Sequence, residues 1–327
     1  MVRRAFAFVF VIVAALSLAG EALRQNPYRG AIASDGNGRI LFEDSADASA
    51  YPASVSKLMT ALLVLEDIRA GRYGFDTLVT ATHDVYKSEP SWIGLKDGER
   101  MSVRDLLFAL LVESANDGAI ALAVHSAGSL DKFVARMNTR AAELGMGATR
   151  YYNPNGLPPN AKRRYPWKQH NVTTARDQLK LALEILKHQE ILVFTSVQTC
   201  DLIRTTYGYR VALVSASNRT IVKSQLKPNE KIVRRLENHN NIMRGRKLQV
   251  VNQDGRNAVD GLKTGYIDDG GSSIVVTALR SGKRVVVVVL GSDAERNVIG
   301  LTLKKSVDVR DENARRILVD TLGSLVW

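Results

Sequence analysis

The chain contains a single cysteine, Cys200, among its 327 residues. One cysteine excludes an intrachain disulfide, and no cysteine lies near the start of the chain, where a lipid could be attached. A domain of this size can rely on its hydrophobic core, so the lack of a disulfide is compatible with export. We expect Cys200 to be a small, buried hydrophobic residue.

Metal-ligand patterns and sequence repeats are also missing. No internal repeat or low-complexity tract occurs, and the composition is that of an ordinary globular protein. We expect neither a metal ion nor a cofactor, because the histidines show no ligand-like spacing. There are five of them: His83, His125, His170, His188 and His239.

The charge balance is strongly basic, with a formal net charge of +12. Such a charge favours anionic surroundings such as nucleic acid, acidic lipid or an anionic wall polymer. The basic residues are not interleaved with aromatic ones, so we expect no nucleic-acid partner. A solvated basic face is the expectation, with an anionic wall polymer or a membrane surface as its partner.

The first residues have the pattern of an export signal. Arg3 and Arg4 precede an apolar run over residues 5–19, and the chain turns polar at Glu21. A positive start, a short apolar stretch and small residues after it are typical of a secretory signal peptide, which we expect at residues 1–22. The run is shorter than the roughly 20 residues that cross a bilayer. An uncleaved amino-terminal anchor is the alternative.

Apolar spacing along the chain predicts both helices and strands. Helical spacing occurs at residues 54–70, 103–127, 130–144, 174–188 and 311–322. Strand-like spacing occurs at residues 38–43, 273–278 and 284–290, the last two joined by a hairpin turn at 280–283. This order predicts an α+β fold, an antiparallel sheet flanked by helices with an inserted, mostly helical lobe. Residues 189–236 mix short strand-like and basic pieces, and we assign no element there.

A first motif, Ser-x-x-Lys, stands at the predicted start of a helix, with Ser54 and Lys57. Residues three apart share a helix face, so the amine can reach the hydroxyl. A serine becomes a good nucleophile when a base removes its proton, and a lysine with a lowered pKa can be that base. The helix start also offers backbone N–H groups to an oxyanion. The alternative is an N-capping serine followed by a solvated lysine.

A second motif, Ser-x-Asn, interrupts the apolar stretch at residues 103–127 with Ser114 and Asn116. Polar groups in such a stretch need partners. In a functional interpretation, Ser114 relays a proton to a leaving amine and Asn116 holds a substrate amide. The alternative is a break that these two residues cap, with Asp117 beginning the next helix.

A third motif, Lys-Thr-Gly, precedes the late hairpin as Lys263, Thr264 and Gly265. A lysine and a threonine on an exposed strand can bind a substrate carboxylate by charge and hydrogen bond. A second cation would also favour a neutral amine on the lysine of the first motif. Gly265 lets a substrate lie close to the strand, where the Tyr266 N–H can complete an oxyanion hole. The alternative is an ordinary turn.

The three motifs in this order form the set found in β-lactamases and penicillin-binding proteins. Longer stretches carry a closer resemblance, among them SDGNGRILFEDSADASAYPASVSKLMT, SVRDLLFALLVESANDGAIALA, NHNNIM and VDGLKTGY. They resemble the D-alanyl-D-alanine carboxypeptidases, the low-molecular-mass penicillin-binding proteins. The resemblance covers most of the chain after the predicted signal peptide.

This resemblance implies a β-lactamase/DD-peptidase-like fold and a serine peptidase of the cell envelope or periplasm. The implied substrates are peptidoglycan stem peptides, which lose their terminal D-alanine, and the implied covalent inhibitors are β-lactams. Implied roles are Ser54 as acylating nucleophile, Lys57 as general base, Ser114 and Asn116 as relay and positioning groups, and Lys263 and Thr264 at the substrate carboxylate. Family members use a further arginine there, for which Arg296 is the nearest candidate.

We expect one catalytic domain at residues 27–327. Its sheet lobe would comprise about 27–80 and 237–327, its helical lobe about 81–236, and no carboxy-terminal β-domain would follow. The family usually has threonine where this chain has Ser56.

Two segments depart from the family pattern in length. Residues 189–236 are longer than the usual connection, and residues 300–309 have no known counterpart. We expect the apolar residues that end the closing helix to pack against the sheet rather than to anchor the chain in a membrane. These are Ile317, Leu318, Leu322, Leu325 and Val326.

Three alternatives share much of this pattern. A D,D-endopeptidase that cleaves peptidoglycan cross-links would use the same residues. A β-lactamase of the usual type needs a glutamate in a Glu-x-x-Leu-Asn segment, which does not follow Asn116, so penicillin should be held rather than turned over rapidly. A non-catalytic wall-binding protein is disfavoured because the expected catalytic groups are all present.

Overall fold

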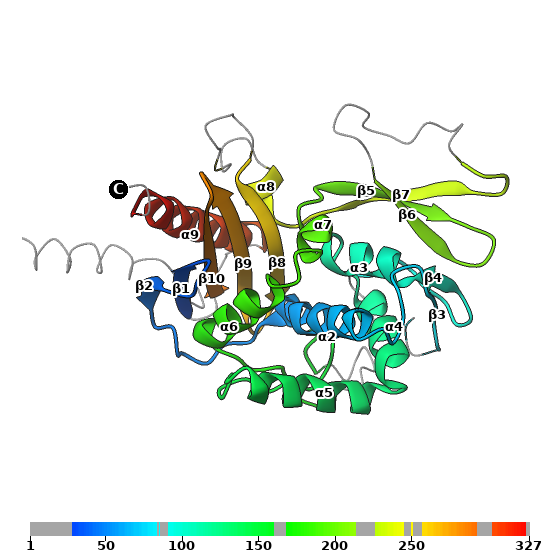
Figure 1. Cartoon of the computed structure of the whole chain (residues 1–327), viewed down its shortest axis with the longest axis horizontal. Helices are drawn as coiled ribbons and strands as arrows, with labels where there is room; N and C mark the ends of the chain where they lie inside the picture. Colours follow the sequence, from blue (N-terminus) through cyan, green and yellow to red (C-terminus); the bar gives the residue numbers. More distant parts are fainter. Residues whose placement is uncertain are drawn as a thin grey trace, which may run out of the picture.

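The computed structural model describes residues 28–83, 85, 91–159, 168–213, 226–244, 250, 257–292 and 303–324. Its centre is a five-stranded antiparallel sheet in the order β2-β1-β10-β9-β8 (Figure 1). The strands are β1 (Gly30–Asp35), β2 (Ile40–Asp44), β8 (Val259–Ile267), β9 (Gly271–Arg280) and β10 (Lys283–Ser292). The predicted α+β class is confirmed, whereas β1 is a strand that the sequence pattern did not predict.

Alternating valines on β10 divide the hydrophobic core into two layers. Val286 and Val288 belong to the core that the central helices share, and Val285 and Val287 belong to the core under α9 (Leu303–Ser324). Successive side chains of a strand point to opposite faces, so both faces of this strand are covered. Figure 1 shows α9 on one face of the sheet and α6 with α2 on the other.

The helices between β2 and β5 carry most of the predicted helical segments. They are α2 (Lys57–Arg69), α3 (Val103–Leu111), α4 (Asn116–Ala127), α5 (Leu130–Glu143) and α6 (Ala175–Ile185). The prediction of one helical stretch at 103–127 was incomplete, because the chain breaks at 112–115 between α3 and α4. The helix predicted from residue 54 begins as the 3-10 turn η1 (Ala53–Ser56), and the α-helix starts only at Lys57.

The segment that the sequence pattern left unassigned forms a small sheet of its own. After α7 (Ile191–Thr195), the strands β5 (Thr199–Arg204), β6 (Tyr209–Leu213) and β7 (Lys231–Glu237) pair in the order β6-β5-β7. This inserted sheet extends outward beside α3, near the short strands β3 (Leu78–Thr80) and β4 (Arg100–Ser102) (Figure 1). Cys200 on β5 is buried, as predicted, and burial raises the pKa of its thiol to about 12.

The closing helix α9 begins at Leu303 rather than at residue 311, so the segment at 303–309 is its first two turns. Ile317, Leu318 and Leu322 are buried under the sheet, as expected, while Leu325 and Val326 lie outside the described residues. A short helix, α8 (Asn241–Arg244), precedes β8. Among the described helices, none combines the length and the apolar character needed to cross a membrane. The predicted signal peptide at 1–22 lies outside the described residues.

Candidate active site

Close backbone packing holds the turn that carries Ser54. Ala53 has a φ of +49°, and Gly156 packs so tightly against it that a Cβ at Gly156 would lie 1.8 Å from the Ala53 carbonyl oxygen. Neither η1 nor α2 has a side-chain cap, so Ser54 is not an N-capping serine. Its hydroxyl instead meets Lys57.

Lys57 lies at the centre of the site and is fully buried. Its Nζ is 2.8 Å from Ser54 Oγ, 2.8 Å from Asn116 Oδ1 and 2.7 Å from the carbonyl oxygen of Asn155. A neutral amine has two N–H donors and one lone pair. It can donate to the amide and carbonyl oxygens, which only accept, and receive the hydroxyl proton of Ser54. The three contacts therefore suit a neutral amine.

The electrostatic surroundings also favour the neutral form. Burial lowers the pKa of Lys57 well below its usual value, and the nearby charge of Lys263 lowers it further, while Asp117 opposes both. A lysine with a lowered pKa holds a free lone pair at neutral pH and can act as a base.

Ser114 lies in the break between α3 and α4 with a φ of +65°, which is uncommon outside glycine. Such a conformation costs roughly 1–3 kcal/mol and persists where the surroundings enforce it. No side chain caps the start of α4, and the Asn116 oxygen accepts from Lys57 instead, so the capping alternative does not describe this break. The buried Asp117 carboxylate accepts four backbone N–H groups, from Ile93, Gly94, Leu95 and Gly118.

Lys263, Thr264 and Gly265 lie on β8, an edge strand of the main sheet. This strand packs against η1. Lys263 is buried and donates to the Thr264 carbonyl oxygen at 2.8 Å. Burial lowers the pKa of Lys263 to about 7, with a further contribution from the charge of Arg310 and an opposing one from Glu113.

Tyr266 ends the motif with its side chain exposed, its hydroxyl donating to Asp268 Oδ1 at 3.0 Å. The phenol is therefore committed to the neighbouring turn.

A cavity of about 330 Å³ connects the three motifs. From the predicted set, its lining contains Ser54, Ser114, Thr264, Gly265 and Tyr266, while Lys57, Asn116 and Lys263 are buried. Sequence reasoning missed the rest of the lining, which consists of Ser91, His239, Asn241, Val307 and Arg310. Hydroxyls, amides and cations gathered around one nucleophile suit acyl transfer from a ligand with an anionic group to that nucleophile.

Arg310, on α9, is the arginine that reaches this cavity, whereas Arg296 lies outside the described residues. It is buried and paired with Asp311 at 2.6 Å, and Asp311 in turn accepts from Asn241 Nδ2 at 2.9 Å. A signal was present in the sequence. Arg310 stands three and four residues from Val307 and Ala314, on the apolar side of the helix, and charged residues are seldom buried unless they are paired.

Metal-ligating clusters are not part of this site. The described ranges contain no group of three His, Cys, Asp or Glu side chains able to hold a metal ion. Of the five histidines, His239 lines the cavity.

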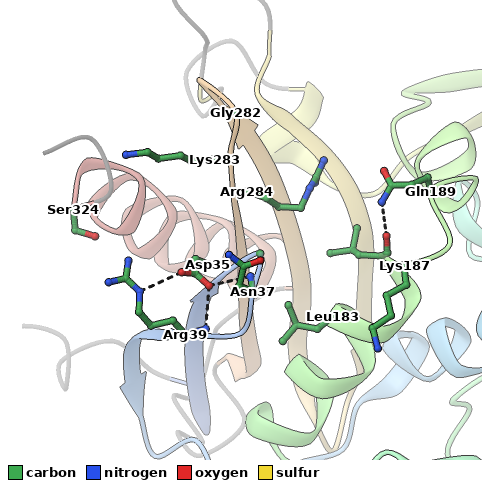
Figure 2. Close-up of a pocket in the computed structure, with 12 residues that line it drawn as sticks. Asp35, Asn37, Arg39, Leu183, Lys187, Gln189, Gly282, Lys283, Arg284 and Ser324 are labelled. Atoms are coloured by element: carbon green, nitrogen blue, oxygen red, sulfur yellow. Dashed lines mark hydrogen bonds and ion pairs between the residues drawn. The ribbon is translucent and has the colours of Figure 1, made fainter.

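A second cavity, of about 1030 Å³, lies at the hairpin end of the sheet and shares no lining residue with the first (Figure 2). The β1–β2 turn, the end of α6 and the β9–β10 turn surround it. Three of its cations have carboxylate partners, in the pairs Arg39–Asp35, Lys187–Glu184 and Arg284–Asp260. Because the carboxylate in each pair neutralises its cation, we assign no anion site to this cavity.

The sequence is similar to those of known proteins. The sequence matches the profile of the D-alanyl-D-alanine carboxypeptidase family over residues 29–226. DacF, a D-alanyl-D-alanine carboxypeptidase from Bacillus subtilis, is 28% identical over 262 residues, which are 80% of this chain and 56% of that protein. A D-alanyl-D-alanine endopeptidase from Pseudomonas aeruginosa is 34% identical over 166 residues, 50% of this chain and 49% of that protein.

Solved structures share the fold as well. Penicillin-binding protein D2 from Listeria monocytogenes, in its ampicillin-bound form, superimposes with a TM-score of 0.64 at 26% identity, covering 90% of this chain and 97% of that one. The chain spans 56% and 59% of the length of the first two curated relatives that it matches. With the family profile matched over more than half of its length, the chain belongs to the D-alanyl-D-alanine carboxypeptidase family.

Proposed function

We propose that this protein is a serine carboxypeptidase that removes the terminal D-alanine from peptidoglycan stem peptides. The observation that carries the proposal is the 2.8 Å contact between Ser54 Oγ and Lys57 Nζ, beside a cavity that Ser114 and Thr264 also line. Membership of the family supports the same reaction.

The proposed reaction begins when Ser54 Oγ attacks the carbonyl carbon of the penultimate D-alanine while Lys57 accepts the hydroxyl proton. The C–N bond to the last D-alanine then breaks, and its nitrogen receives a proton through Ser114. Water attacks the resulting ester, gives a proton to Lys57, and the trimmed peptide leaves as Ser54 recovers its proton. The N–H groups of Ser54 and Tyr266 are the proposed oxyanion donors.

Asn116 and the cations of the cavity have binding roles in this scheme. We assign the substrate amide to Asn116, and the terminal carboxylate to Lys263 and Thr264, by charge and hydrogen bond. Arg310 is the further arginine at that carboxylate, in place of Arg296. Its position in the cavity and its pairing with Asp311, which orients the guanidinium, support this assignment.

Penicillin labelling tests the proposal directly. The purified protein is incubated with a fluorescent penicillin, digested and examined by mass spectrometry, and release of D-alanine from a stem pentapeptide is measured in parallel. We expect one stable adduct on Ser54, no adduct in Ser54→Ala, and D-alanine release by the native protein alone. A folded protein that stays unlabelled, or a Ser54→Ala variant that is labelled, would refute the mechanism. Labelling and peptide binding without D-alanine release would favour a non-catalytic wall-binding role.

A second candidate is a D,D-endopeptidase, because an endopeptidase is among the similar proteins, at 34% identity over 166 residues. The two activities share the acyl-enzyme and differ in the leaving group, a free D-alanine or a cross-linked peptide. Digestion of purified cross-linked muropeptide dimers beside monomeric pentapeptides separates them. Faster cleavage of the dimers would replace the carboxypeptidase assignment.

We propose a location in the cell envelope, reached through the predicted signal peptide at 1–22 or with that segment kept as an anchor. Fractionation followed by amino-terminal sequencing distinguishes a cleaved periplasmic protein from an anchored one. The net charge of +12 supports an anionic wall polymer or membrane surface as a further partner. Such binding would weaken as salt is raised in a sedimentation assay with purified walls or anionic vesicles.

A further inference from the structure

The side chain of Arg234 joins two chain segments that frame Ser114. Arg234 lies on β7 of the inserted sheet, and its Nη1 donates to Glu113 Oε1 at 2.8 Å. Its Nη2 donates to the carbonyl oxygen of Trp92. The other oxygen of Glu113 accepts the N–H of Glu237, the last residue of β7, at 3.2 Å. One arginine therefore ties the inserted sheet to the residue directly before Ser114.

These contacts act on a conformation that needs external support. Ser114 has a φ of +65°, and a strained backbone of this kind persists where neighbouring groups enforce it. On the far side of the turn, the Asn116 N–H donates to the carbonyl oxygen of Ser91 at 2.7 Å. On the near side, the Glu113 carboxylate is held by Arg234. The turn is thus fixed at both ends, once by the neighbouring loop and once by the inserted sheet.

The same strand also leads into the lining of the cavity. β7 ends at Glu237, and His239 and Asn241, which follow directly, line the cavity with Ser114. The Glu113 carboxylate therefore contacts the end of β7, two residues before His239 of the cavity lining. The segment at 189–236, which we expect to depart from the family in length, thus includes most of a strand that contacts Glu113, next to Ser114.

We propose that the Glu113–Arg234 ion pair positions Ser114 for proton transfer, so that the inserted sheet is a working part of the active site. The inference rests on the proposed function. Arg234 is a positioning residue, because it acts through Glu113 and lies outside the cavity lining. An exposed arginine paired with a partly buried glutamate contributes little to stability, so its loss should affect the reaction more than the fold.

Stopped-flow fluorescence with a fluorescent penicillin measures non-covalent binding and acylation as separate steps. The native protein is compared with Arg234→Ala, Arg234→Lys, Glu113→Gln and the double variant Glu113→Gln/Arg234→Ala. The matched control is Arg210→Ala, which breaks the Arg210–Glu230 pair of the same inserted sheet. We expect the acylation rate constant of Arg234→Ala to fall about 10- to 100-fold, as for a misplaced catalytic group, with the non-covalent dissociation constant within twofold. Lysine at 234 should restore part of the rate, and Arg210→Ala should match the native protein.

The double variant gives the sharpest outcome. If the two residues act as one unit, it is no slower than the slower of the two single variants, whereas losses that multiply would overturn the proposal. Native acylation in Arg234→Ala would overturn it as well. If Arg234→Ala does not fold, Arg234→Lys and Glu113→Gln provide the comparison. If the native protein is not acylated at Ser54, the proposed function is refuted. Comparison of the thermal unfolding temperatures of the native protein and Arg234→Ala then measures what the ion pair contributes to stability.

Discussion

The backbone of Ser54 lies directly against Gly265 of β8. A Cβ at Gly265 would lie 2.9 Å from Ser54 N and 2.7 Å from the Pro52 carbonyl oxygen. Both distances are too short for non-bonded atoms, so a side chain here would clash with the backbone. The sequence predicts that Gly265 leaves room for a substrate. The structure shows a further reason for glycine, which is that the strand and the nucleophile's turn touch backbone to backbone.

Gly265→Ala should therefore displace the nucleophile. We expect a loss of about 1–3 kcal/mol in the free energy of unfolding, as for other overpacked positions, together with slower penicillin acylation. Urea unfolding and stopped-flow labelling measure the two effects. Gly74→Ala is the control, because nothing lies within 4 Å of a Cβ there. If both variants have the same unfolding free energy and acylation rate, the turn that carries Ser54 can shift to accommodate a Cβ without loss of stability or activity.

Lys57→Met keeps the length of the side chain and removes the base. General base catalysis contributes about 10²- to 10⁴-fold, so acylation of Ser54 should slow by that factor. Circular dichroism should show a folded protein, since Met suits a fully buried position. Acylation at the native rate would mean that another group takes the proton of Ser54.

Asp117→Asn tests how the start of α4 supports the base. Its carboxylate accepts four buried backbone N–H groups, and an amide accepts through one oxygen only, so we expect a loss of about 1–3 kcal/mol in stability. Because Asp117 raises the pKa of Lys57, its neutralisation should move the acid limb of kcat/KM to lower pH. The exposed Asp131→Asn, in the first turn of α5, is the control. An acid limb that stays in place would contradict this electrostatic link.

Lys263 should set the alkaline limb of kcat/KM. Its pKa is lowered to about 7 by burial and then by Arg310, so the cation that holds the substrate carboxylate is present below that pH and is lost above it. Arg310→Gln removes the second cause, which should shift the limb to higher pH while raising KM. Arg315→Gln on the same helix, whose partner is Glu312, should change neither. If the alkaline limb does not move in Arg310→Gln, the charge of Arg310 does not lower the pKa of Lys263.

How much could be predicted depended on the range of each interaction. The contact between Ser54 and Lys57 spans three residues, so local spacing was enough to predict it. The strands β9 and β10 were visible as β-branched runs because both their faces are buried. In contrast, β7 contains Arg234 and Arg235, whose charges hide the strand pattern. Their ion-pair partners Glu113 and Asp201 lie elsewhere in the chain.

The amino-acid sequence by itself determined the candidate reactive groups and their order, with a serine and a lysine in one turn, a polar break in an apolar helical region and a lysine and a threonine on a late strand. Only the tertiary structure decided that Arg310 lines the cavity and that the inserted sheet contacts Glu113, next to Ser114. Those outcomes depend on distances between segments remote in the chain, which the packing of helices and strands sets. The lowered pKa values of Lys57 and Lys263 have the same origin, since burial and neighbouring charge exist only once the chain has folded.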